Sequence, residues 1–392
     1  MKIVLVMAHG RVHDRKGGGH SVFFAMANHL SQKHQVMAIY DDSRQGTPLY
    51  HCEPSVDLVN LVTPINFPFR NLVKVRREFI RASEKLLGVP KNYNALTKKR
   101  QEMVADALKN TLDAFNPDIC IAFNMSDLRS IVLATLPTRT FPIITMCHTD
   151  THRVFSRLAI YERNIVNSSD VFQVLLDEYQ TPVRELTSVP VVTIGNIIPQ
   201  LDDSSLCSEP KLVYMARLEK NKRQYELIEA ISKIPEEVRY NWTLHLFGNA
   251  ADDGYVQSLK RLIASKKLTN VVKIEGVTDQ PYEELLNSSI CCFPSALEGF
   301  SLALGEAMSA GLPCVAFEDC PGLSSLIKHG QTGYLERNVD SMAETLSELM
   351  QNRSLRLKIG QQAKESVRRY SAEHIWSEWE TLLEETIRHA KR

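Results

Sequence analysis

A chain of 392 residues is too long for one ordinary hydrophobic core, and it predicts two domains of roughly 200 residues or fewer. Lysine plus arginine and aspartate plus glutamate each number 46, so the formal charge is zero and gives no general attraction for nucleic acid. Eight cysteines without a Cys-x-x-Cys pair indicate buried thiols in a reducing compartment, rather than a disulfide framework or a zinc site of that type.

The sequence predicts a cytoplasmic protein. Its first residues, Met-Lys-Ile-Val-Leu-Val-Met, form an apolar run that is too short and wrongly flanked for a signal peptide. No segment approaches the roughly 18 uninterrupted apolar residues of a transmembrane helix. We therefore expect the protein in the cytoplasm, and one basic segment leaves open a peripheral position at the inner face of the cell membrane.

The first predicted elements are a strand at 3–7, a glycine-rich loop and an amphipathic helix that ends near Leu30. The loop contains Gly17, Gly18 and Gly19. A strand, a glycine-rich loop and a helix in this order bring backbone N–H groups close to a phosphate or sugar. Three adjacent glycines are not the Gly-x-Gly-x-x-Gly dinucleotide pattern, so a merely flexible loop stays an alternative.

Two further strands, at 36–40 and 56–62, precede a basic amphipathic segment at 67–81. This segment mixes cations with apolar side chains: Arg70, Lys74, Arg76, Arg77 and Arg81 among Phe67, Phe69, Leu72, Val73, Phe79 and Ile80. Such a helix can lie on an anionic bilayer. An ordinary surface helix whose arginine stems cover apolar neighbours has the same pattern. Membrane contact through 67–81 is therefore one of two hypotheses.

A buried strand predicted at 141–148 ends in a candidate site residue, His148. The run from His148 to His152 offers two histidines and an aspartate, but a strand-to-loop transition does not keep alternate ligands on one face. We therefore expect no metal there. The alternative to a role of His148 in a site is a structural one, as a histidine that is hydrogen-bonded at a domain interface. The neighbouring predicted elements are a helix at 94–115 and strands at 118–123, 170–175 and 191–194.

The polar, proline-containing stretch 196–210 is the predicted interdomain linker. After it, a strand at 211–216 leads to Arg217 and Lys222, just before a helix. Two cations at the carboxyl end of a strand and beside a helix N-terminus form a clamp suited to a diphosphate. A solvated loop is the ordinary alternative. Two more strands are predicted at 244–248 and 271–275.

The densest pattern in the chain lies at 290–317. Two apolar runs, 290–293 and 314–317, have the length and boundaries of buried parallel strands. The loop after the first run carries Glu298, and Ser301 can cap the helix that follows. The apolar stripe of that helix is predicted at Ala303, Leu304, Ala307 and Met308.

Glu306 lies at the rim of the same helix and is separated from Glu298 by seven residues. Loops and helix N-termini at the carboxyl ends of a parallel sheet bind ligands, and their free N–H groups suit a diphosphate. A carboxylate beside them would repel phosphate, so its natural partner is a pair of sugar hydroxyls. A loop glutamate and a surface-helix glutamate remain the alternative.

The run Glu-Gly-Phe-Ser-(x)4-Glu-Ala-Met, followed by Gly-Leu-Pro, resembles the Glu-x7-Glu signature of retaining nucleotide-sugar glycosyltransferases, family four of that class. The resemblance covers about 40 contiguous residues with their flanking strands. It implies an α/β protein of the GT-B fold, with two Rossmann-like parallel-sheet domains facing a central cleft. The implied domains are 1–195, on the acceptor side, and 196–371, on the donor side. A C-terminal crossover helix at 372–392 would rejoin the first domain.

The resemblance also implies roles for individual residues. Arg217 and Lys222 match the Arg-x4-Lys spacing that binds the donor diphosphate, and His148 matches a histidine placed against the donor sugar. Glu298 would hold sugar hydroxyls and Glu306 the ribose. The implied donor-binding set also includes Gly17, Gly18, Gly19, Gly248, Val277, Phe300, Ser301 and Leu302. No metal and no other cofactor is implied.

Three positions depart from the family pattern. Glycine is usual where Ala216 and Arg223 stand, so Lys220 stays an alternative to Lys222, and Ser325 replaces the usual acidic residue. The resemblance implies a metal-independent hexosyl- or N-acetylhexosaminyltransferase that uses a UDP-sugar, or else a GDP-sugar. Its acceptor would be a glycan or lipid-linked hydroxyl of a bacterial lipopolysaccharide, capsule or teichoic-type polymer.

Two other kinds of protein fit parts of this pattern. A sugar-nucleotide epimerase or a phosphorylase can share the fold, although no convincing pyridoxal lysine is present for a phosphorylase. A non-catalytic sugar-nucleotide binding subunit needs the same binding residues without turnover. The joint presence of Glu298, Glu306, Arg217 and Lys222 favours the enzyme over a subunit that has lost activity.

Overall fold

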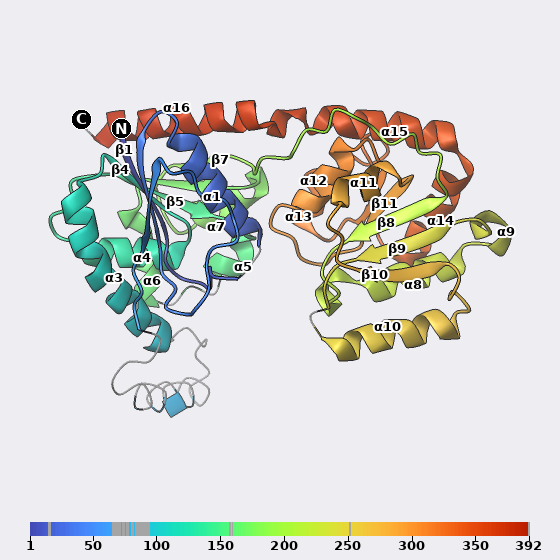
Figure 1. The fold of residues 1–392 in the computed structure, drawn as a ribbon, viewed down its shortest axis with the longest axis horizontal. Coiled ribbons are helices and arrows are strands. Elements are labelled where there is room, and N and C mark those ends of the chain that lie inside the picture. The colour runs from blue at the N-terminus through green and yellow to red at the C-terminus, as the bar shows by residue number, and fades with distance from the viewer. Residues whose placement is uncertain are drawn as a thin grey trace. The chain divides into compact units, whose positions relative to one another are not determined.

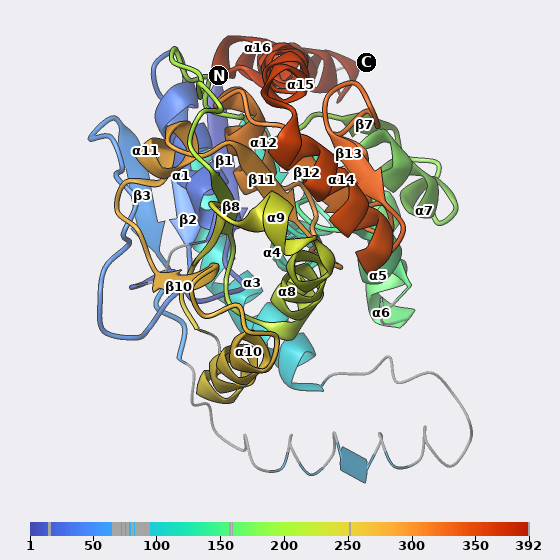
Figure 2. The same cartoon turned by 90° about the vertical axis from the view of Figure 1, so that its right-hand side faces the viewer.

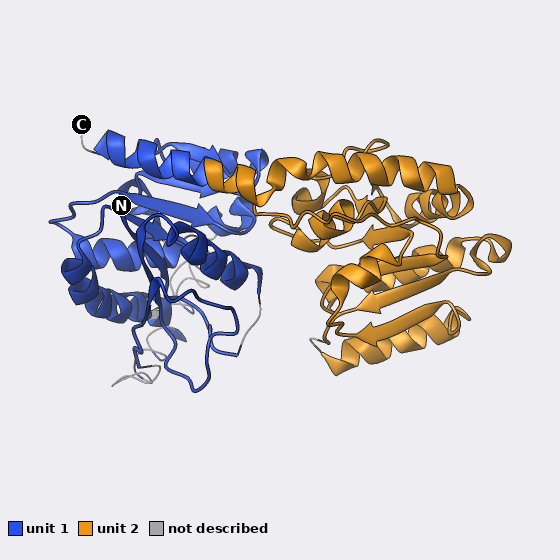
Figure 3. Ribbon diagram, turned by 45° about the horizontal axis from the view of Figure 1, so that its top comes forward, with its two compact units in different colours: residues 1–194, 378–392 blue, residues 195–377 orange. Residues whose placement is uncertain are grey.

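The computed structural model of the chain describes residues 1–14, 17–64, 72, 75, 78–79, 82, 95–156, 158, 160–250 and 252–390. The chain forms two compact units (Figure 3). Unit 1 contains residues 1–194 and 378–392, and unit 2 contains residues 195–377. Each unit has its own parallel sheet, with helices on both faces (Figures 1 and 2).

Unit 1 is built on a seven-stranded parallel sheet in the order β3-β2-β1-β4-β5-β6-β7. The strands are β1 (Lys2–Met7), β2 (Gln35–Tyr40), β3 (Val56–Asn60), β4 (Ile119–Ala122), β5 (Ile143–Cys147), β6 (Val171–Val174) and β7 (Val191–Thr193). The helices are α1 (Gly18–Leu30), α3 (Ala95–Phe115), α4 (Met125–Thr135), α5 (Thr151–Phe155), α6 (Ile160–Arg163), α7 (Gln180–Arg184) and the 3₁₀ turns η1 (Val166–Ser168) and η2 (Asp177–Tyr179). The strands predicted at 3–7 and 118–123 and the buried strand predicted at 141–148 are confirmed as β1, β4 and β5, which are almost entirely buried apolar runs.

Unit 2 has a six-stranded parallel sheet in the order β10-β9-β8-β11-β12-β13. The strands are β8 (Lys211–Met215), β9 (Thr243–Phe247), β10 (Val272–Gly276), β11 (Ile290–Phe293), β12 (Cys314–Phe317) and β13 (Tyr334–Glu336). The helices are α8 (Gln224–Lys233), α9 (Glu236–Arg239), α10 (Asp253–Ser265), α11 (Pro281–Leu286), α12 (Leu302–Ser309), α13 (Pro321–Ser324), α14 (Val339–Gln351), α15 (Arg353–Ser366) and the 3₁₀ turns η3 (Lys220–Lys222) and η4 (Arg368–Tyr370). The two strands predicted at 290–293 and 314–317 have the expected bounds.

The stretch 196–210 is polar in sequence, yet it packs on unit 2. Ile198 and Cys207 are completely buried, and the Ser205 amide donates to the carbonyl of Ala310 over 2.8 Å. Ile198 also explains why residue 305 of α12 is glycine, because a Cβ there would lie 2.5 Å from the Ile198 Cδ1.

The predicted apolar stripe of α12 is therefore right at three positions and wrong at one. Leu304, Ala307 and Met308 are completely buried, whereas Ala303 is only half-buried. The buried face turns toward Gly305 instead, since the helix packs against residue 198 as well as against the sheet.

The last helix, α16 (Ala372–Ala390), begins in unit 2 and belongs to unit 1 from residue 378 onward. Within unit 1, Trp379 and Leu383 are buried, and Glu380 accepts from His34 Nε2 over 2.9 Å. The helical character predicted for this end of the chain is confirmed.

Candidate active site

The order of the strands in unit 2 reverses between β8 and β11. From β8 the chain moves outward through β9 and β10, and it returns to β11 before moving the other way through β12 and β13. In parallel sheets the loops at the carboxyl ends of two such strands leave a crevice that binds ligands. The loop after β8 carries Arg217 and Lys222, and the loop after β11 carries Glu298. The predicted cations and carboxylate thus follow the two strands at the switch point.

The backbone that presents Arg217 is held by its neighbours. Gly248, with φ of 146°, lies so close that a Cβ there would be 2.0 Å from the carbonyl oxygen of Ala216. Gln224 donates its side-chain amide to the Arg217 carbonyl over 2.9 Å, and the Leu218 amide donates to the Asn249 carbonyl over 3.0 Å. Close approach of the Ala216 backbone therefore explains why residue 248 is glycine. The contact of Gly248 with the donor stays a prediction.

Both predicted phosphate-binding cations are paired with carboxylates. Lys222 Nζ lies 2.6 Å from Glu298 Oε1, and Arg217 Nη2 lies 2.8 Å from Glu219 Oε1. Lys222 and Glu298 are largely buried, at 12% and 17% side-chain exposure, whereas Arg217 is 58% exposed. Lys220, the alternative lysine, is exposed. Lys222 is therefore the lysine that this fold brings to Glu298.

Glu219 competes with an anionic ligand for Arg217, so we expect Glu219→Gln to tighten the binding of UDP. A partly exposed ion pair of this kind contributes up to about 1 kcal/mol, which corresponds to about a fivefold gain in affinity. Uridine, which has no phosphate, should bind Glu219→Gln and the unaltered protein equally well. Isothermal titration with UDP and uridine measures both affinities.

A matched control for this substitution is Glu229→Gln. Glu229 lies on α8 and pairs with Lys266 over 2.7 Å, and both carboxylates are about one-fifth exposed. Removing its charge should leave UDP affinity unchanged. An unchanged or weaker affinity in Glu219→Gln would show that Glu219 does not compete for Arg217.

Tyr214, which the sequence analysis did not predict as a site residue, links the loop after β8 to the loop after β11. It is buried in β8, its hydroxyl donates to the carbonyl of Lys222 over 2.9 Å, and it lies 2.7 Å from the Ser295 hydroxyl. Burial raises the pKa of Tyr214 well above its usual value. The Ala296 amide adds a direct link, donating to the Asn221 carbonyl over 2.8 Å. A tyrosine inside an apolar strand gives no sequence signal for this partner.

Glu298 is also packed from its other side by Gly322, on α13. A Cβ at Gly322 would lie 2.4 Å from the Glu298 carbonyl oxygen and 2.9 Å from its Cβ. Glycine is therefore required by contact with the Glu298 backbone, and not by its own backbone conformation. Nothing in the sequence around 322 indicated this contact.

The N-terminus of α12 follows the prediction in part. Ser301 caps it, with the Leu304 amide donating to Ser301 Oγ over 3.3 Å, and Leu302 is the first helical residue. Phe300 is predicted to bind the donor, but its side chain is buried against Tyr370, with ring centroids 5.2 Å apart. At Phe300 only the backbone is left to face a ligand.

Glu306 lies near Tyr282, a residue of α11 that the sequence did not single out. Burial raises the pKa of Glu306 to about 7, and the hydrogen bond from Tyr282 lowers it by a smaller amount. The pKa of Tyr282 is raised by burial and then by the Glu306 charge. Val277 follows β10 and Gly276, whose φ is 80°, and its side chain is 71% exposed. An exposed apolar residue after a strand of this sheet can cover the flat face of a base.

His148 lies in unit 1, at the carboxyl end of β5. Its ring stacks on Phe123, with centroids 5.1 Å apart, and neither ring nitrogen has a hydrogen-bond partner in the described part of the chain. Burial lowers the pKa of His148 to about 4, so the imidazole is neutral at pH 7. Two buried ring nitrogens without partners can donate to, and accept from, a ligand hydroxyl.

The predicted glycines also lie in unit 1, at the start of α1. Gly17 is the residue before the helix, and its amide donates to the Tyr50 hydroxyl over 3.0 Å. Gly18 and Gly19 form the first helical turn and are exposed. These glycines therefore leave a 13-residue helix open at its N-terminus, where backbone N–H groups suit an anion or a sugar hydroxyl.

Buried aspartates hold the loop between β1 and α1. Asp42 accepts from the amides of Val12 and His13 over 2.9 and 3.1 Å, and Asp127 accepts from the amide of Ala8 over 2.9 Å. Burial raises the pKa of Asp127 well above its usual value. Hydrogen bonds of this kind fix the backbone at the three residues whose amides donate, Ala8, Val12 and His13.

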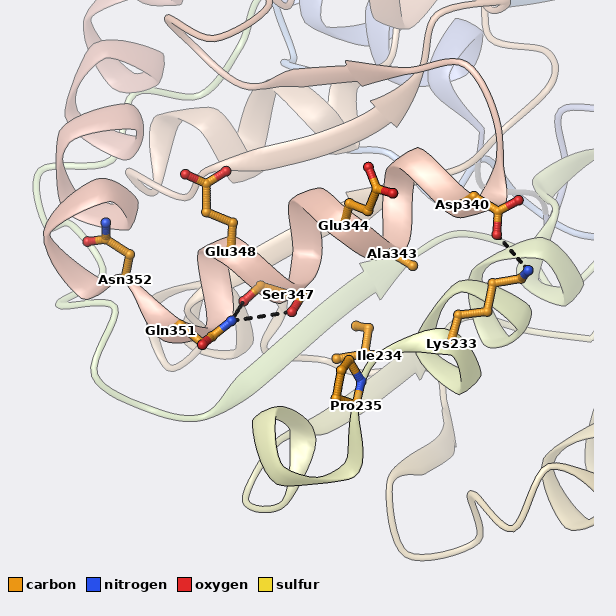
Figure 4. Close-up of a pocket in the computed structure, with 10 residues that line it drawn as sticks. All are labelled: Lys233, Ile234, Pro235, Asp340, Ala343, Glu344, Ser347, Glu348, Gln351 and Asn352. Atoms are coloured by element: carbon orange, nitrogen blue, oxygen red, sulfur yellow. Dashed lines mark hydrogen bonds and ion pairs between the residues drawn. The ribbon is translucent and has the colours of Figure 1, made fainter.

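Other features of the structure bear on the predictions. A groove of about 780 Å³ lies between the end of α8 and α14, and its lining, which includes Lys233, Asp340 and Glu344, contains none of the predicted site residues (Figure 4). Within the described ranges, no set of three or more His, Cys, Asp and Glu residues is placed to hold a metal ion. None of the described helices is long and apolar enough to cross a bilayer. The basic segment 67–81 lies largely outside the described residues.

Comparison with known proteins places the second unit in a defined group. Residues 204–366 match the family model described as glycosyl transferases group 1. The chain is 26% identical to an exopolysaccharide phosphotransferase of Streptomyces coelicolor, over 99% of this chain and 41% of that protein. It is 29% identical to the poly(glycerol-phosphate) alpha-glucosyltransferase of Bacillus subtilis, over 45% of this chain and 26% of that protein. The chain spans less than half the length of both curated relatives.

Among solved structures, the chain is similar to that of a mutant of Staphylococcus aureus TarM in complex with Fondaparinux, alpha-GlcNAc-glycerol and UDP. The TM-score is 0.71 with 17% identity, and the match covers 97% of this chain and 99% of the other. The likeness establishes the two-sheet GT-B fold that the sequence predicted.

Proposed function

We infer that this chain, whose residues 204–366 match the glycosyl transferases group 1 family, is a retaining glycosyltransferase that moves a sugar from a nucleoside diphosphate sugar to a hydroxyl acceptor. The observation that carries the proposal is the pairing of Lys222 with Glu298 at the switch point of the second sheet, 2.6 Å apart. A cation for the leaving diphosphate and a carboxylate for sugar hydroxyls are thereby adjacent. Family membership alone would not place these two groups together.

We assign the departing diphosphate to Arg217, Lys222 and the backbone N–H groups near Ser301 and Leu302. A nucleoside diphosphate is already an activated leaving group, so the reaction needs stabilisation of developing negative charge more than a paired acid and base. Fixed cations and N–H groups supply this stabilisation. When the donor binds, Lys222 exchanges part of its contact with Glu298 for a phosphate oxygen, and the carboxylate becomes available to sugar hydroxyls.

We assign the ribose to Glu306 and a contact with the sugar to His148 of unit 1. The exposed Val277 supports a base position near the end of β10. UDP is favoured over GDP, and the similarity in fold to a TarM structure that holds UDP supports this choice. The two unpartnered ring nitrogens of His148 support its role. No step in this scheme requires a metal, and activity in the presence of a chelator tests that part.

The acceptor is proposed to be a bacterial surface glycan or its lipid-linked precursor. Support comes from the names of the two relatives, an exopolysaccharide phosphotransferase and a poly(glycerol-phosphate) alpha-glucosyltransferase. A cytoplasmic enzyme that works on such an acceptor benefits from a position at the inner face of the membrane. Membrane contact through 67–81 therefore remains part of the proposal, and sedimentation with anionic phospholipid vesicles tests it.

A panel of UDP- and GDP-sugars, each incubated with and without poly(glycerol phosphate), tests the main proposal. We expect one UDP-sugar to release UDP rapidly only when the acceptor is present. The released anomer or the linkage formed, read by NMR, reports retention. An epimerase would convert the sugar without transfer, and a binding subunit would bind UDP without turnover of any donor.

The pKa of Glu306 leads to a prediction for pH. If ribose hydroxyls donate to Glu306, binding favours its ionised form, and the free protein must lose a proton near pH 7 before it binds. Uridine affinity should therefore fall by about tenfold between pH 8 and pH 6. Uridine has no phosphate, so phosphate ionisation does not contribute to the measurement.

Two variants check the origin of this pH dependence. In Glu306→Gln, uridine should bind weakly at every pH, because the group that titrates is gone. In Tyr282→Phe, the midpoint should move to higher pH, because the ionised carboxylate loses a hydrogen-bond donor. Uridine affinity that is constant from pH 6 to pH 8 in the unaltered protein would contradict the assignment of Glu306 to the ribose.

A further inference from the structure

Arg223 occupies a backbone conformation that favours glycine. Its φ of 50° and ψ of 36° place it in the left-handed region, between the 3₁₀ turn η3 and the first residue of α8. A residue with a Cβ in this region costs on the order of 1 kcal/mol, whereas glycine adopts it freely. The arginine is therefore present at a conformational cost, which its side chain can offset.

The guanidinium group of Arg223 makes a two-pronged contact with Asp319. Nη1 donates to Oδ1 over 2.8 Å and Nη2 to Oδ2 over 2.7 Å, and the guanidinium also lies over the ring of Phe317, 5.6 Å from its centre. Hydrogen bonds to Asp319 raise the pKa of Arg223. A planar fork of this kind fixes orientation as well as charge.

This contact joins two loops whose strands do not pair with each other. Arg223 follows β8 and Asp319 follows β12, and β11 lies between these strands in the sheet. The loop after β11, which carries Glu298, therefore lies between these two joined loops, an arrangement called the bracket below. Lys222 contacts Glu298 from the β8 side, and Gly322 contacts its backbone from the β12 side.

We propose that Arg223 and Asp319 form a positioning pair. By joining the loops on either side of the Glu298 loop, the pair holds the side chains of Lys222 and Glu298 in the relative positions needed for turnover. The inference rests on the proposed function, since it concerns the same donor site. Arg223 acts through its neighbours, because its fork is already filled by the two oxygens of Asp319. A direct contact of Arg223 with a donor phosphate is the competing explanation.

The expected signature separates positioning from simple stabilisation. Asp319 is 55% exposed, and an ion pair at such a position contributes little to folding. Arg223→Gly also removes the backbone cost, so its melting temperature should equal that of the unaltered protein or exceed it. Turnover should nevertheless fall, because small displacements at a reacting centre carry large kinetic effects.

Three variants test the proposal: Arg223→Gly, Asp319→Asn and the two combined. We expect the release of UDP from UDP-glucose or UDP-N-acetylglucosamine, with saturating acceptor, to fall about tenfold in each single variant. The double variant should fall no further, since both changes open the same bracket. UDP affinity should change less than about threefold, because Arg217 and Lys222 remain.

The matched control is Asp340→Asn. Asp340 is also an exposed aspartate that pairs with a cation of α8, Lys233, over 2.6 Å (Figure 4). Lys233 is the last residue of α8, whereas Arg223 precedes its first residue. Turnover in Asp340→Asn should equal that of the unaltered protein. Exchanging the charges, with Arg223→Asp and Asp319→Arg together, should restore turnover toward normal, because aspartate tolerates the left-handed region.

Each outcome has one meaning. Tighter UDP binding with normal turnover in Asp319→Asn would show that Arg223 is a direct phosphate ligand, and it would overturn the positioning pair. Normal turnover in both single variants would also overturn it. If the unaltered protein neither binds UDP nor consumes any sugar nucleotide, the proposed function itself fails. Should Arg223→Gly not fold, Asp319→Asn, which leaves the backbone unchanged, decides the matter.

Discussion

Replacing Lys222 with methionine is expected to lower turnover by about 10²- to 10³-fold, the effect of losing one group that stabilises charge in a transition state. Methionine keeps most of the length of the apolar stem, so the change removes the charge and little of the packing. The loss should appear mainly in kcat, because negative charge on the leaving diphosphate grows as the glycosidic bond breaks. Steady-state release of UDP, with and without acceptor, measures it.

Lys220→Met is the control for this experiment, since it removes an exposed lysine from the same 3₁₀ turn. Its turnover should be close to normal. Equal losses in the two variants would indicate a general effect of charge, and normal turnover in Lys222→Met would remove Lys222 from the site. Glu298→Gln should lower turnover less when it is added to Lys222→Met than when it is made in the unaltered protein, because the two side chains are in contact.

Gly322→Ala should lower turnover by about 10²-fold although residue 322 contacts no proposed ligand atom. The added methyl group would overlap the Glu298 carbonyl, 2.4 Å away, and the atom it meets is backbone, which cannot rotate aside. Glu298 must shift, and a shift on the order of 1 Å at a reacting centre is enough for a loss of that size. Kinetic measurement of UDP release should show the loss in kcat.

Uridine affinity should stay normal in Gly322→Ala, because the proposed ribose and base contacts at Glu306 and Val277 do not involve α13. A normal uridine affinity therefore distinguishes a shift of Glu298 from unfolding. Gly254→Ala is a suitable control in the same unit, where the new methyl group would meet only the Asp252 carboxylate, 3.3 Å away. A fully active Gly322→Ala protein would mean that the position of Glu298 does not limit the reaction.

Sequence reasoning predicted the strands and the main helices because their causes are local. Interior parallel strands such as β11 and β12 are uninterrupted apolar runs ended by turn residues, and Ser301 caps α12 by a bond within one helical turn. The spacing of Arg217, Lys222, Glu298 and Glu306 followed from a resemblance in the primary sequence. The positions of Arg217, Lys222 and Glu298 after the two strands of the switch point then follow from the topology.

The features that were missed depend on partners far away in the chain. Tyr214 bonds to Ser295, Gly322 meets Glu298 and Gly305 meets Ile198, and none of these pairs leaves a periodic signal. Phe300 has the sequence position of a donor-site residue, but its contact with Tyr370 turns its ring into the core. Arg223 was noted only as a departure from the usual glycine, and its hydrogen bonds to Asp319 could not be predicted from the sequence.

The membership of α16 in two units has a consequence for how the protein is made on the ribosome. The first sheet is complete when residue 194 has been synthesised, yet Trp379 and Leu383, which complete the core of that unit, come after the whole of unit 2. At ordinary elongation rates, unit 1 waits on the order of 10 to 40 s with apolar surface uncovered. During that interval the nascent first half is a natural client for a chaperone.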